Sequence, residues 1–253
     1  MRAKVAIIMS TYNGAEFLEN TVKSVLNQSY QNFILFIVDD FSTDPISKEI
    51  LKKIKYTDSR IKVFFRKKNY GTYSARNFGI KKAKKLKYLC FLDHDDLWDK
   101  KKLEFQLRAH LMHPKLALST TNYQIFTKKG NAMIKKKRVI FPELITFSDI
   151  RKYNLIILSS TMVNMALVKN IEFRKSNISD YYMWFDLIKK HGPAKNIQKI
   201  LTYYYVGQNT KSSNKMNMIL RYLKFQLDIN KFNLIAIVIN FFFYINANIK
   251  KRF

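Results

Sequence analysis

The segment Phe91-Leu92-Asp93-His94-Asp95-Asp96-Leu97-Trp98 is the most informative part of the sequence. With the apolar residues from Tyr88 onward, it predicts a buried strand that ends in three aspartates within four residues. Ionised carboxylates repel one another at this spacing, so the cluster costs free energy unless a cation lies among them. A divalent cation with oxygen ligands, which can also hold a diphosphate, meets this need. A solvated acidic turn before the next helix is the alternative, and the segment alone does not decide between them.

Three earlier apolar runs also end in polar or acidic residues. Amphipathic helical patterns separate the runs, so the spacing predicts an α/β fold with a mostly parallel central sheet flanked by helices. Ligands bind beyond the carboxyl ends of strands in such sheets. We therefore expect a binding site where the strand ends meet. The runs and their endings are Val5–Met9 with Ser10-Thr11-Tyr12, Phe33–Val38 with Asp39-Asp40, and Ile61–Phe65 with Asn69-Tyr70-Gly71.

The pattern changes in the second half of the chain. We expect strands at Leu116–Phe126, Leu155–Val163 and Leu201–Val206, and a polar loop from Gln208 to Lys215. A capped helix is expected from Ser179, with Asp180 in its first turn and an end at His191-Gly192.

The end of the chain predicts two helices, Met218–Leu227 and Phe232–Ile245. The second is apolar but too short, and too interrupted by Asn240, to predict a membrane span. The basic residues Lys250-Lys251-Arg252 follow it. Two alternatives remain, a helix packed on the body of the protein and an interfacial helix on an anionic leaflet.

The composition of the chain indicates which classes of molecule it could bind. The net charge of +28 favours anionic partners, namely nucleic acid, a phosphate-bearing substrate or an acidic membrane surface. A nucleic-acid-binding module needs aromatic residues interleaved with cations on one surface, whereas Phe and Ile here fall at core periods. The single cysteine, Cys90, excludes an internal disulfide and is expected to be buried. Residues 1–4 lead into the first strand without a signal-peptide pattern, so we expect a cytoplasmic protein.

Several motifs, taken in their order, resemble family 2 of the inverting glycosyltransferases, enzymes with a GT-A nucleotide-sugar-binding fold. The similarity is greatest to bacterial enzymes that build capsule, O-antigen of lipopolysaccharide, or wall polysaccharide. The motifs are VAIIMSTYNG (5–14), NQSY (27–30), VDDFSTD (38–44), DSRI (58–61), NYGTYSARNFGI (69–80), FLDHDDLW (91–98) with KLE (102–104), SDYYMWFDLI (179–188) and YYVGQNTKSSNK (204–215).

The resemblance implies a role for each matching residue. Asp180 takes the position of the catalytic base. Asp93 and Asp95 form the D-x-D pair that holds Mn²⁺ or Mg²⁺ on the diphosphate, with Asp93 also near the ribose. The residues implied to bind the nucleotide are Ser10, Thr11, Tyr12, Asp39 and Arg76.

The resemblance also implies which part of the chain binds each substrate and which reaction the protein catalyses. Residues 1–115 would bind the nucleotide sugar and 116–215 the acceptor. Residues 216–253 would form a C-terminal helical tail, for which packing on the body and association with the membrane both stay open. The expected reaction is metal-dependent, inverting transfer (hexosyltransferase type), most simply from a UDP-sugar, to a hydroxyl of a surface glycan on a lipid-pyrophosphate carrier. The protein would lie on the inner face of the cytoplasmic membrane and bind no nucleic acid.

Two departures and two alternatives accompany this expectation. Ser179 replaces the usual Glu or Gln, and Val206-Gly207 stands where many relatives have a basic residue. A nucleotidyltransferase on a similar fold is one alternative, although no glycine-rich phosphate loop follows Met9. A basic nucleic-acid-binding module is the other.

Overall fold

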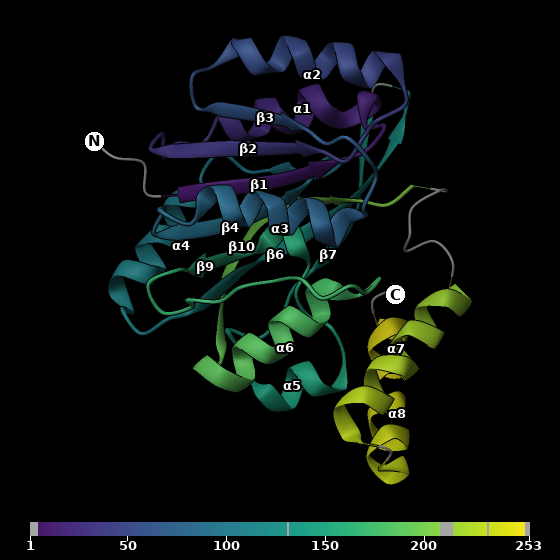
Figure 1. The fold of residues 1–253 in the computed structure, drawn as a ribbon. Helices are drawn as coiled ribbons and strands as arrows, with labels where there is room; N and C mark the ends of the chain where they lie inside the picture. Colours follow the sequence, from purple (N-terminus) through teal and green to yellow (C-terminus); the bar gives the residue numbers. More distant parts are fainter. Residues whose placement is uncertain (1–4, 131, 208–214, 232, 251–253) are drawn as a thin grey trace.

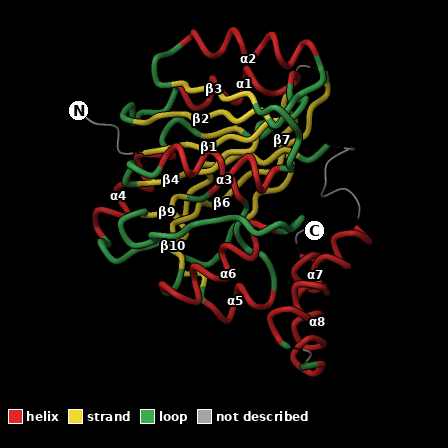
Figure 2. Tube along the Cα trace, in the orientation of Figure 1, coloured by secondary structure: helices red, strands yellow, loops and turns green. Residues whose placement is uncertain are grey.

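The computed structural model describes residues 5–130, 132–207, 215–231 and 233–250. The expected start at 1–4, most of the loop expected at Gln208–Lys215, and the basic residues Lys251 and Arg252 lie outside these ranges. The described chain forms a large mixed sheet with helices on both faces (Figure 1). Figure 2 shows the strands as a central block between α1 and α2 on one side and α5 and α6 on the other. The predicted α/β class, with helices flanking the sheet and closing the chain, is confirmed.

The first half of the chain is a parallel sheet with helical crossovers. Its strands pair in the order β3-β2-β1-β4. Each apolar run predicted from the sequence forms a strand. The elements are β1 (Val5–Thr11), α1 (Ala15–Leu26), β2 (Phe33–Asp39), α2 (Pro45–Thr57), β3 (Ile61–Phe65), α3 (Thr72–Ala83) and β4 (Tyr88–Asp93).

The second half extends the sheet with mixed strand directions. Strand β9 runs antiparallel between β4 and β6, and β6 is parallel to β10. The remaining elements are β5 (Leu97–Trp98), α4 (Lys102–Met112), β6 (Leu118–Lys129), β7 (Ala132–Val139), β8 (Leu144–Ile145), α5 (Phe147–Lys152), the 3₁₀ turn η1 (Leu158–Ser160), β9 (Met162–Asn164), α6 (Ser179–His191), β10 (Ala194–Tyr205), α7 (Lys215–Asn230) and α8 (Leu234–Lys250).

Alternate residues of each central strand enter two separate cores. In β1, Val5, Ile7 and Met9 pack with α1, α2 and α4, whereas Ala6 and Ile8 face the core that contains α3 and α6. Successive strand side chains point to opposite faces, so burial on both faces requires an uninterrupted apolar run. This requirement explains why the first strands could be recognised from the sequence.

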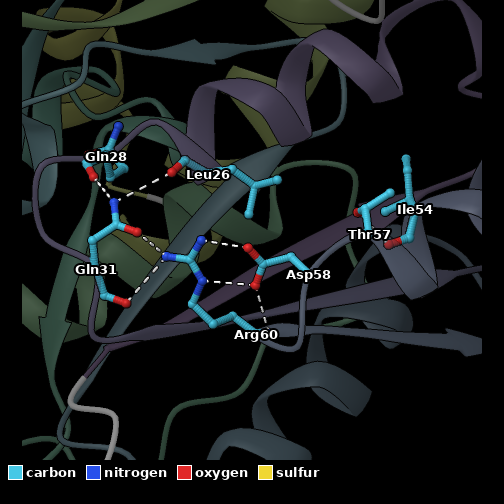
Figure 3. A network of polar contacts seen from close by, with 7 residues as sticks. All are labelled: Leu26, Gln28, Gln31, Ile54, Thr57, Asp58 and Arg60. Atoms are coloured by element: carbon cyan, nitrogen blue, oxygen red, sulfur yellow. Dashed lines mark hydrogen bonds and ion pairs between the residues drawn. The ribbon is translucent and has the colours of Figure 1, made fainter.

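One of the motifs behind the family resemblance stabilises the fold away from the strand ends. Arg60 donates from Nε and Nη2 to the two carboxylate oxygens of Asp58, at 2.9 and 2.6 Å. Its Nη1 also donates to the side-chain oxygen of Gln31, which precedes β2 (Figure 3). The Arg60 guanidinium lies over the ring of Phe33, 4.5 Å from the ring centre. The Asp58-Ser59-Arg60 turn therefore joins the end of α2 to the starts of β2 and β3.

Two local predictions were wrong. The strand expected at Leu155–Val163 is replaced by the η1 turn and the short β9. The hydroxyls of Ser160 and Thr161 donate to the carbonyls of Ile157 and Leu158, and such local bonds compete with strand pairing.

The second error concerns the start of α1. Asn13 followed by Glu16 three positions later has the spacing of a capping pair, which predicts that Asn13 caps this helix. The helix instead begins after Gly14, without a side-chain cap. The Asn13 side chain accepts hydrogen bonds from the backbone N–H groups of Thr43 and Asp44, so it joins the loops that follow β1 and β2.

The two C-terminal helices form a hairpin beside α5 and α6 (Figure 1). Phe225 of α7 stacks on Tyr181 of α6 with ring centroids 3.8 Å apart, and the Tyr222 hydroxyl donates to the carbonyl of Lys152 at 2.8 Å. Helix α8 inserts Ile237 and Asn240 into the hairpin but exposes a stripe of large apolar side chains. The stripe consists of Leu234, Ile235, Val238, Ile239, Phe242 and Phe243.

Candidate active site

The strand register brings the predicted binding residues to one edge of the sheet. Ser10 is opposite Asp93 across β1 and β4, and Thr11 is opposite Asp39 across β1 and β2. Three strands thus end at the same level with polar side chains. The expectation that the strand ends converge is confirmed.

A cavity of about 830 Å³ opens at this edge. Small-molecule sites usually measure about 300–1,000 Å³, so it has room for a large ligand. Arg76 of α3, Asp93 of β4 and Asp180 of α6 all line it. It therefore combines residues far apart in the sequence, including Asp180 from the second half of the chain.

An ion pair forms one wall of the cavity. The Arg76 guanidinium donates from Nη2 to Oδ1 of Asp93 at 2.6 Å and lies over the Phe173 ring at 5.3 Å. The side chains are 11% and 30% exposed, respectively, so Asp93 retains contact with solvent in the cavity. The pair presents a cation and a carboxylate side by side.

Asp180 lies in the first turn of α6, half-buried in the cavity wall. Burial raises the pKa of its carboxyl group, the Arg76 charge lowers it, and the Asp93 charge raises it. These opposing effects place Asp180 within electrostatic reach of the ion pair. A carboxylate with a raised pKa is a better proton acceptor than an ordinary aspartate.

The three aspartates after β4 differ in their surroundings. Asp96 is buried, and its carboxylate accepts hydrogen bonds from the Ser159 hydroxyl at 2.5 Å and the Tyr205 N–H at 2.9 Å. Burial raises its pKa well above the ordinary range. Asp96 therefore ties this loop to η1 and β10.

Asp95 is half-buried, and burial raises its pKa. Within the described ranges, no lysine or arginine forms an ion pair with it, whereas Asp93 is paired with Arg76. An unpaired, partly desolvated carboxylate fits a cation ligand, and Asp93 is two residues away. The described residues contain no group of three or more His, Cys, Asp and Glu placed to hold a metal. At this loop the described residues therefore offer two carboxylates, those of Asp93 and Asp95, and other ligands of a cation would have to be oxygens of a bound substrate or water.

Asp39 lies in a second, smaller cavity of about 220 Å³ with Phe41, Phe65 and Arg66. The backbone N–H of Ser42 donates to both Asp39 oxygens at 3.2 Å, and the Ser42 hydroxyl donates at 2.5 Å. Burial raises the pKa of Asp39 despite these bonds. The structure thus places Asp39 at the same sheet edge as Asp93, but not in the lining of the larger cavity.

The remaining predicted residues lie at the end of β1. The Ser10 and Thr11 hydroxyls are buried and have no hydrogen-bond partner within the described part of the protein. Buried polar groups without partners are rare, and a bound ligand or water can supply the missing partner. Neither residue is in the lining of the two cavities described above. Tyr12 is 43% exposed, so its ring is accessible for stacking.

Two features of the site were missed from the sequence. Ser159 accepts the Asp93 N–H at 3.0 Å, and its carbonyl accepts the Trp98 indole N–H at 2.8 Å. Ser159 falls within the strand expected at Leu155–Val163, and no motif in the sequence around it indicated a role in the site. The second feature is the basic lining from Lys175, Arg221 and Lys224, which lies in segments without a recognised motif.

The chain matches one family over most of its length. Residues 6–171 match the family model described as Glycosyl transferase family 2. The chain is 35% identical over 224 residues to UDP-Glc:alpha-D-GlcNAc-diphosphoundecaprenol beta-1,3-glucosyltransferase WfaP of Escherichia coli, over 86% of this chain and 83% of the relative. It is 34% identical over 212 residues to TuaG of Bacillus subtilis (strain 168), named as a glycosyltransferase of teichuronic acid biosynthesis, over 83% and 82% of the two chains.

Solved structures share the fold. S. aureus TarS in complex with UDP-GlcNAc superposes with a TM-score of 0.66 at 20% identity, over 87% of this chain and 66% of that one. The mannosyltransferase PcManGT from Pyrobaculum calidifontis, in complex with GDP-Man and Mn²⁺, superposes with a TM-score of 0.67 at 14% identity, over 88% and 64%. At these identities the likeness is one of fold.

Proposed function

The chain belongs to glycosyltransferase family 2, and from this premise we propose that it moves a sugar from a nucleotide-diphosphate sugar to a hydroxyl of a growing bacterial surface glycan, with inversion at the anomeric carbon. The fold is of the GT-A type expected from the motifs. The observation that carries the proposal is the shared cavity of Arg76, Asp93 and Asp180. Asp93 at a strand end and Asp180 from the second half of the chain line the same cavity. This arrangement suits a displacement reaction, in which each of two substrates needs its own acidic group.

In the proposed reaction, Asp180 accepts the proton of the acceptor hydroxyl. The hydroxyl oxygen forms a bond to the anomeric carbon while the bond from that carbon to the diphosphate oxygen breaks. The departing nucleoside diphosphate takes the bonding electrons and accumulates negative charge. Arg76, held by Asp93, provides a fixed positive charge beside it. The raised pKa of Asp180 supports its role as base because proton transfer becomes more favourable.

We assign Asp95 and Asp93 as ligands of Mn²⁺ or Mg²⁺. The unpaired Asp95 carboxylate supports this assignment, as does the need of two neighbouring carboxylates for a compensating charge. When bound, such an ion neutralises charge on a diphosphate. Because Asp93 also pairs with Arg76, we assign the larger share of the protein's metal affinity to Asp95.

We assign the nucleotide to the edge formed by β1, β2 and β4, with UDP as the first choice. The buried Asp39 carboxylate suits a base N–H, and the unpartnered Ser10 and Thr11 hydroxyls suit polar atoms of the nucleotide. The exposed ring of Tyr12 suits stacking on the base. On this proposal residues 1–115 bind the donor and residues 116–215 the acceptor.

We further propose an acceptor on a lipid-diphosphate carrier, as the name of WfaP states for that relative. Helix α8 supports this choice, because its exposed stripe includes Ile235, 75% exposed, and Phe242, 64% exposed. No described helix is both long and apolar enough to cross a bilayer. A stripe of this kind on a strongly basic protein suits the surface of an anionic leaflet, so residues 216–253 would hold the enzyme on the inner face of the cytoplasmic membrane.

The test is sugar transfer by the purified protein. UDP-sugars are supplied with Mn²⁺ and a soluble acceptor, α-D-GlcNAc 1-diphosphate on an undecyl chain, and the product's anomeric configuration is determined by NMR. Asp180→Asn should lower kcat by about 10²–10⁴-fold, the usual contribution of a general base, while UDP binding persists. Asp186→Asn is the matched control, because this carboxylate of the same helix pairs on the surface with Arg174.

Three outcomes would contradict the proposal. Full activity of Asp180→Asn would remove this residue from the role of base. A product with the donor's anomeric configuration would exclude direct displacement. Nucleotide exchange without sugar transfer would indicate a nucleotidyltransferase instead.

A further inference from the structure

The larger cavity is lined by a second group of charged residues besides the Arg76–Asp93 pair. Arg221 and Lys224 of α7 and Lys175 of the segment before α6 line it. Within the described part of the chain, none of the three forms an ion pair with a carboxylate. The one acidic residue of α7, Asp228, lies a turn beyond Lys224, and its carboxylate accepts a hydrogen bond from the Tyr182 hydroxyl. The three cations are therefore available to an anion in the cavity.

The charged residues of the cavity come from two groups of elements. Arg76 of α3 is paired with Asp93 at the end of β4. The three cations without an ion pair come from α7 and from the segment before α6, and α6 and α7 pack through Tyr181 and Phe225. Asp180, the proposed base, begins α6. The cations therefore lie on or next to the helix that carries the proposed base and the helix packed against it.

We propose that Arg221, Lys224 and Lys175 bind the diphosphate of a lipid-linked acceptor, an inference that rests on the proposed function. Arg221 and Lys224 are three residues apart, so they share a face of α7. The same helix leads directly into α8 and its exposed apolar stripe. The helical hairpin therefore offers a cation site for the diphosphate and an apolar face for the hydrocarbon. Arginine and lysine are the side chains that usually bind phosphate groups.

A rival role for these cations is to hold the departing diphosphate of the donor. A comparison of two acceptors distinguishes the roles. One is α-D-GlcNAc 1-diphosphate on an undecyl chain, and the other is the undecyl glycoside of the same sugar, which has no phosphate. The quantity measured is the ratio of kcat/KM for the two acceptors, with one UDP-sugar at saturation.

We expect the unaltered protein to favour the diphosphate acceptor by about tenfold or more, equivalent to about 1.4 kcal/mol. The double variant Arg221→Gln/Lys224→Gln should bring the ratio close to one. The double variant Lys189→Gln/Lys190→Gln removes the same charge at the exposed end of α6 and should keep the ratio. Arg221→Lys should keep most of the preference for the diphosphate acceptor. Thermal unfolding midpoints establish that every variant is folded.

The outcomes separate the inference from the function on which it rests. Equal losses with both acceptors would assign the cations to the donor and overturn the inference. An unchanged ratio in Arg221→Gln/Lys224→Gln would overturn it as well. Equal use of both acceptors by the unaltered protein would overturn the inference alone. Absence of transfer from every UDP-sugar to either acceptor would overturn the proposed function together with the inference.

Discussion

Single residues with the same side chain have different roles after β4. Asp93 pairs with Arg76, Asp95 forms no ion pair with a lysine or arginine of the described residues, and Asp96 is buried and accepts two hydrogen bonds. The sequence was compatible with both a cation site and a structural turn. The contacts of Asp96 are structural, whereas Asp93 and Asp95 are the residues that we propose as cation ligands.

The pH dependence of transfer tests the role of Asp180. Burial raises its pKa, and a base acts only when deprotonated, so transfer should be lost as pH falls through this raised value. At saturating donor, we expect the acidic limb of the kcat profile to lie above the ordinary range of aspartate. Residual transfer by Asp180→Asn should lack this limb. An identical limb in the variant would assign the titration to another group.

A buried lysine provides a second residue-scale prediction. Lys102 is fully buried, with its ammonium nitrogen 4.0 Å from the centre of the Trp98 ring and 2.6 Å from Gln106 Oε1. Burial lowers its pKa from 10.5 to about 8. Between these values the unfolded chain binds the proton and the folded protein does not, so folding stability should rise with pH.

The measurement compares unaltered protein and Lys102→Met by urea unfolding between pH 8 and 10.5. As pH rises through this window, the unfolding free energy of the unaltered protein should increase relative to that of Lys102→Met by up to about 3 kcal/mol. Both proteins carry Cys90→Ala, because burial raises the pKa of Cys90 to about 11 and the Lys102 charge lowers it, so Cys90 would titrate differently in the two proteins. A constant difference would show that Lys102 titrates normally.

At the scale of elements, the parallel strands were predictable because burial on both faces demands continuous apolar runs. The same rule gave a wrong prediction at Leu155–Val163. This segment is also apolar, but it forms the η1 turn and a short strand. Hydrogen bonds from Ser160 and Thr161 to nearby carbonyls decide that outcome. Side-chain competition of this kind depends on partners that periodicity does not reveal.

Helix α8 carries the element-scale prediction. Ile239 and Phe242 are both more than half exposed and share its apolar stripe. The double variant Ile239→Asp/Phe242→Asp should lower partitioning onto vesicles of phosphatidylglycerol and phosphatidylcholine by at least about tenfold, because it removes apolar burial and adds negative charge. Leu111→Asp/Met112→Asp is the matched control, since these residues are equally exposed at the end of α4. Equal binding by all three proteins would show that α8 does not contact the bilayer.

At the scale of the whole molecule, the two halves of the chain meet in one cavity. The convergence of strand ends was predictable from topology, and the placement of Asp180 came from the family resemblance. The lining by Arg221 and Lys224 was not predictable, because α7 is brought to the cavity by packing against elements far away in the sequence, such as Phe225 on α6 and Tyr222 on α5. Long-range packing of this kind has no local sequence signal.

Nucleotide binding provides the whole-molecule prediction. A ligand that binds only the folded protein, at a hundred times its Kd, contributes about 2.7 kcal/mol. For a chain of this size, UDP with Mn²⁺ should therefore raise the unfolding midpoint by about 5–10 °C. Chelation of the metal, or Asp95→Asn, should remove most of this shift, whereas Asp186→Asn should retain it. A full shift in the presence of EDTA would contradict the metal assignment.

The position of Cys90 has a practical consequence. This one cysteine of the chain is fully buried in β4, and its raised pKa keeps the thiol protonated at neutral pH. Maleimide reagents attack accessible thiolates, so Cys90 should not react with them in the folded protein. A fluorophore on a cysteine that replaces Phe242 would report on contact with lipid, and one on a cysteine that replaces Met218 of the cavity lining would report on arrival of an acceptor.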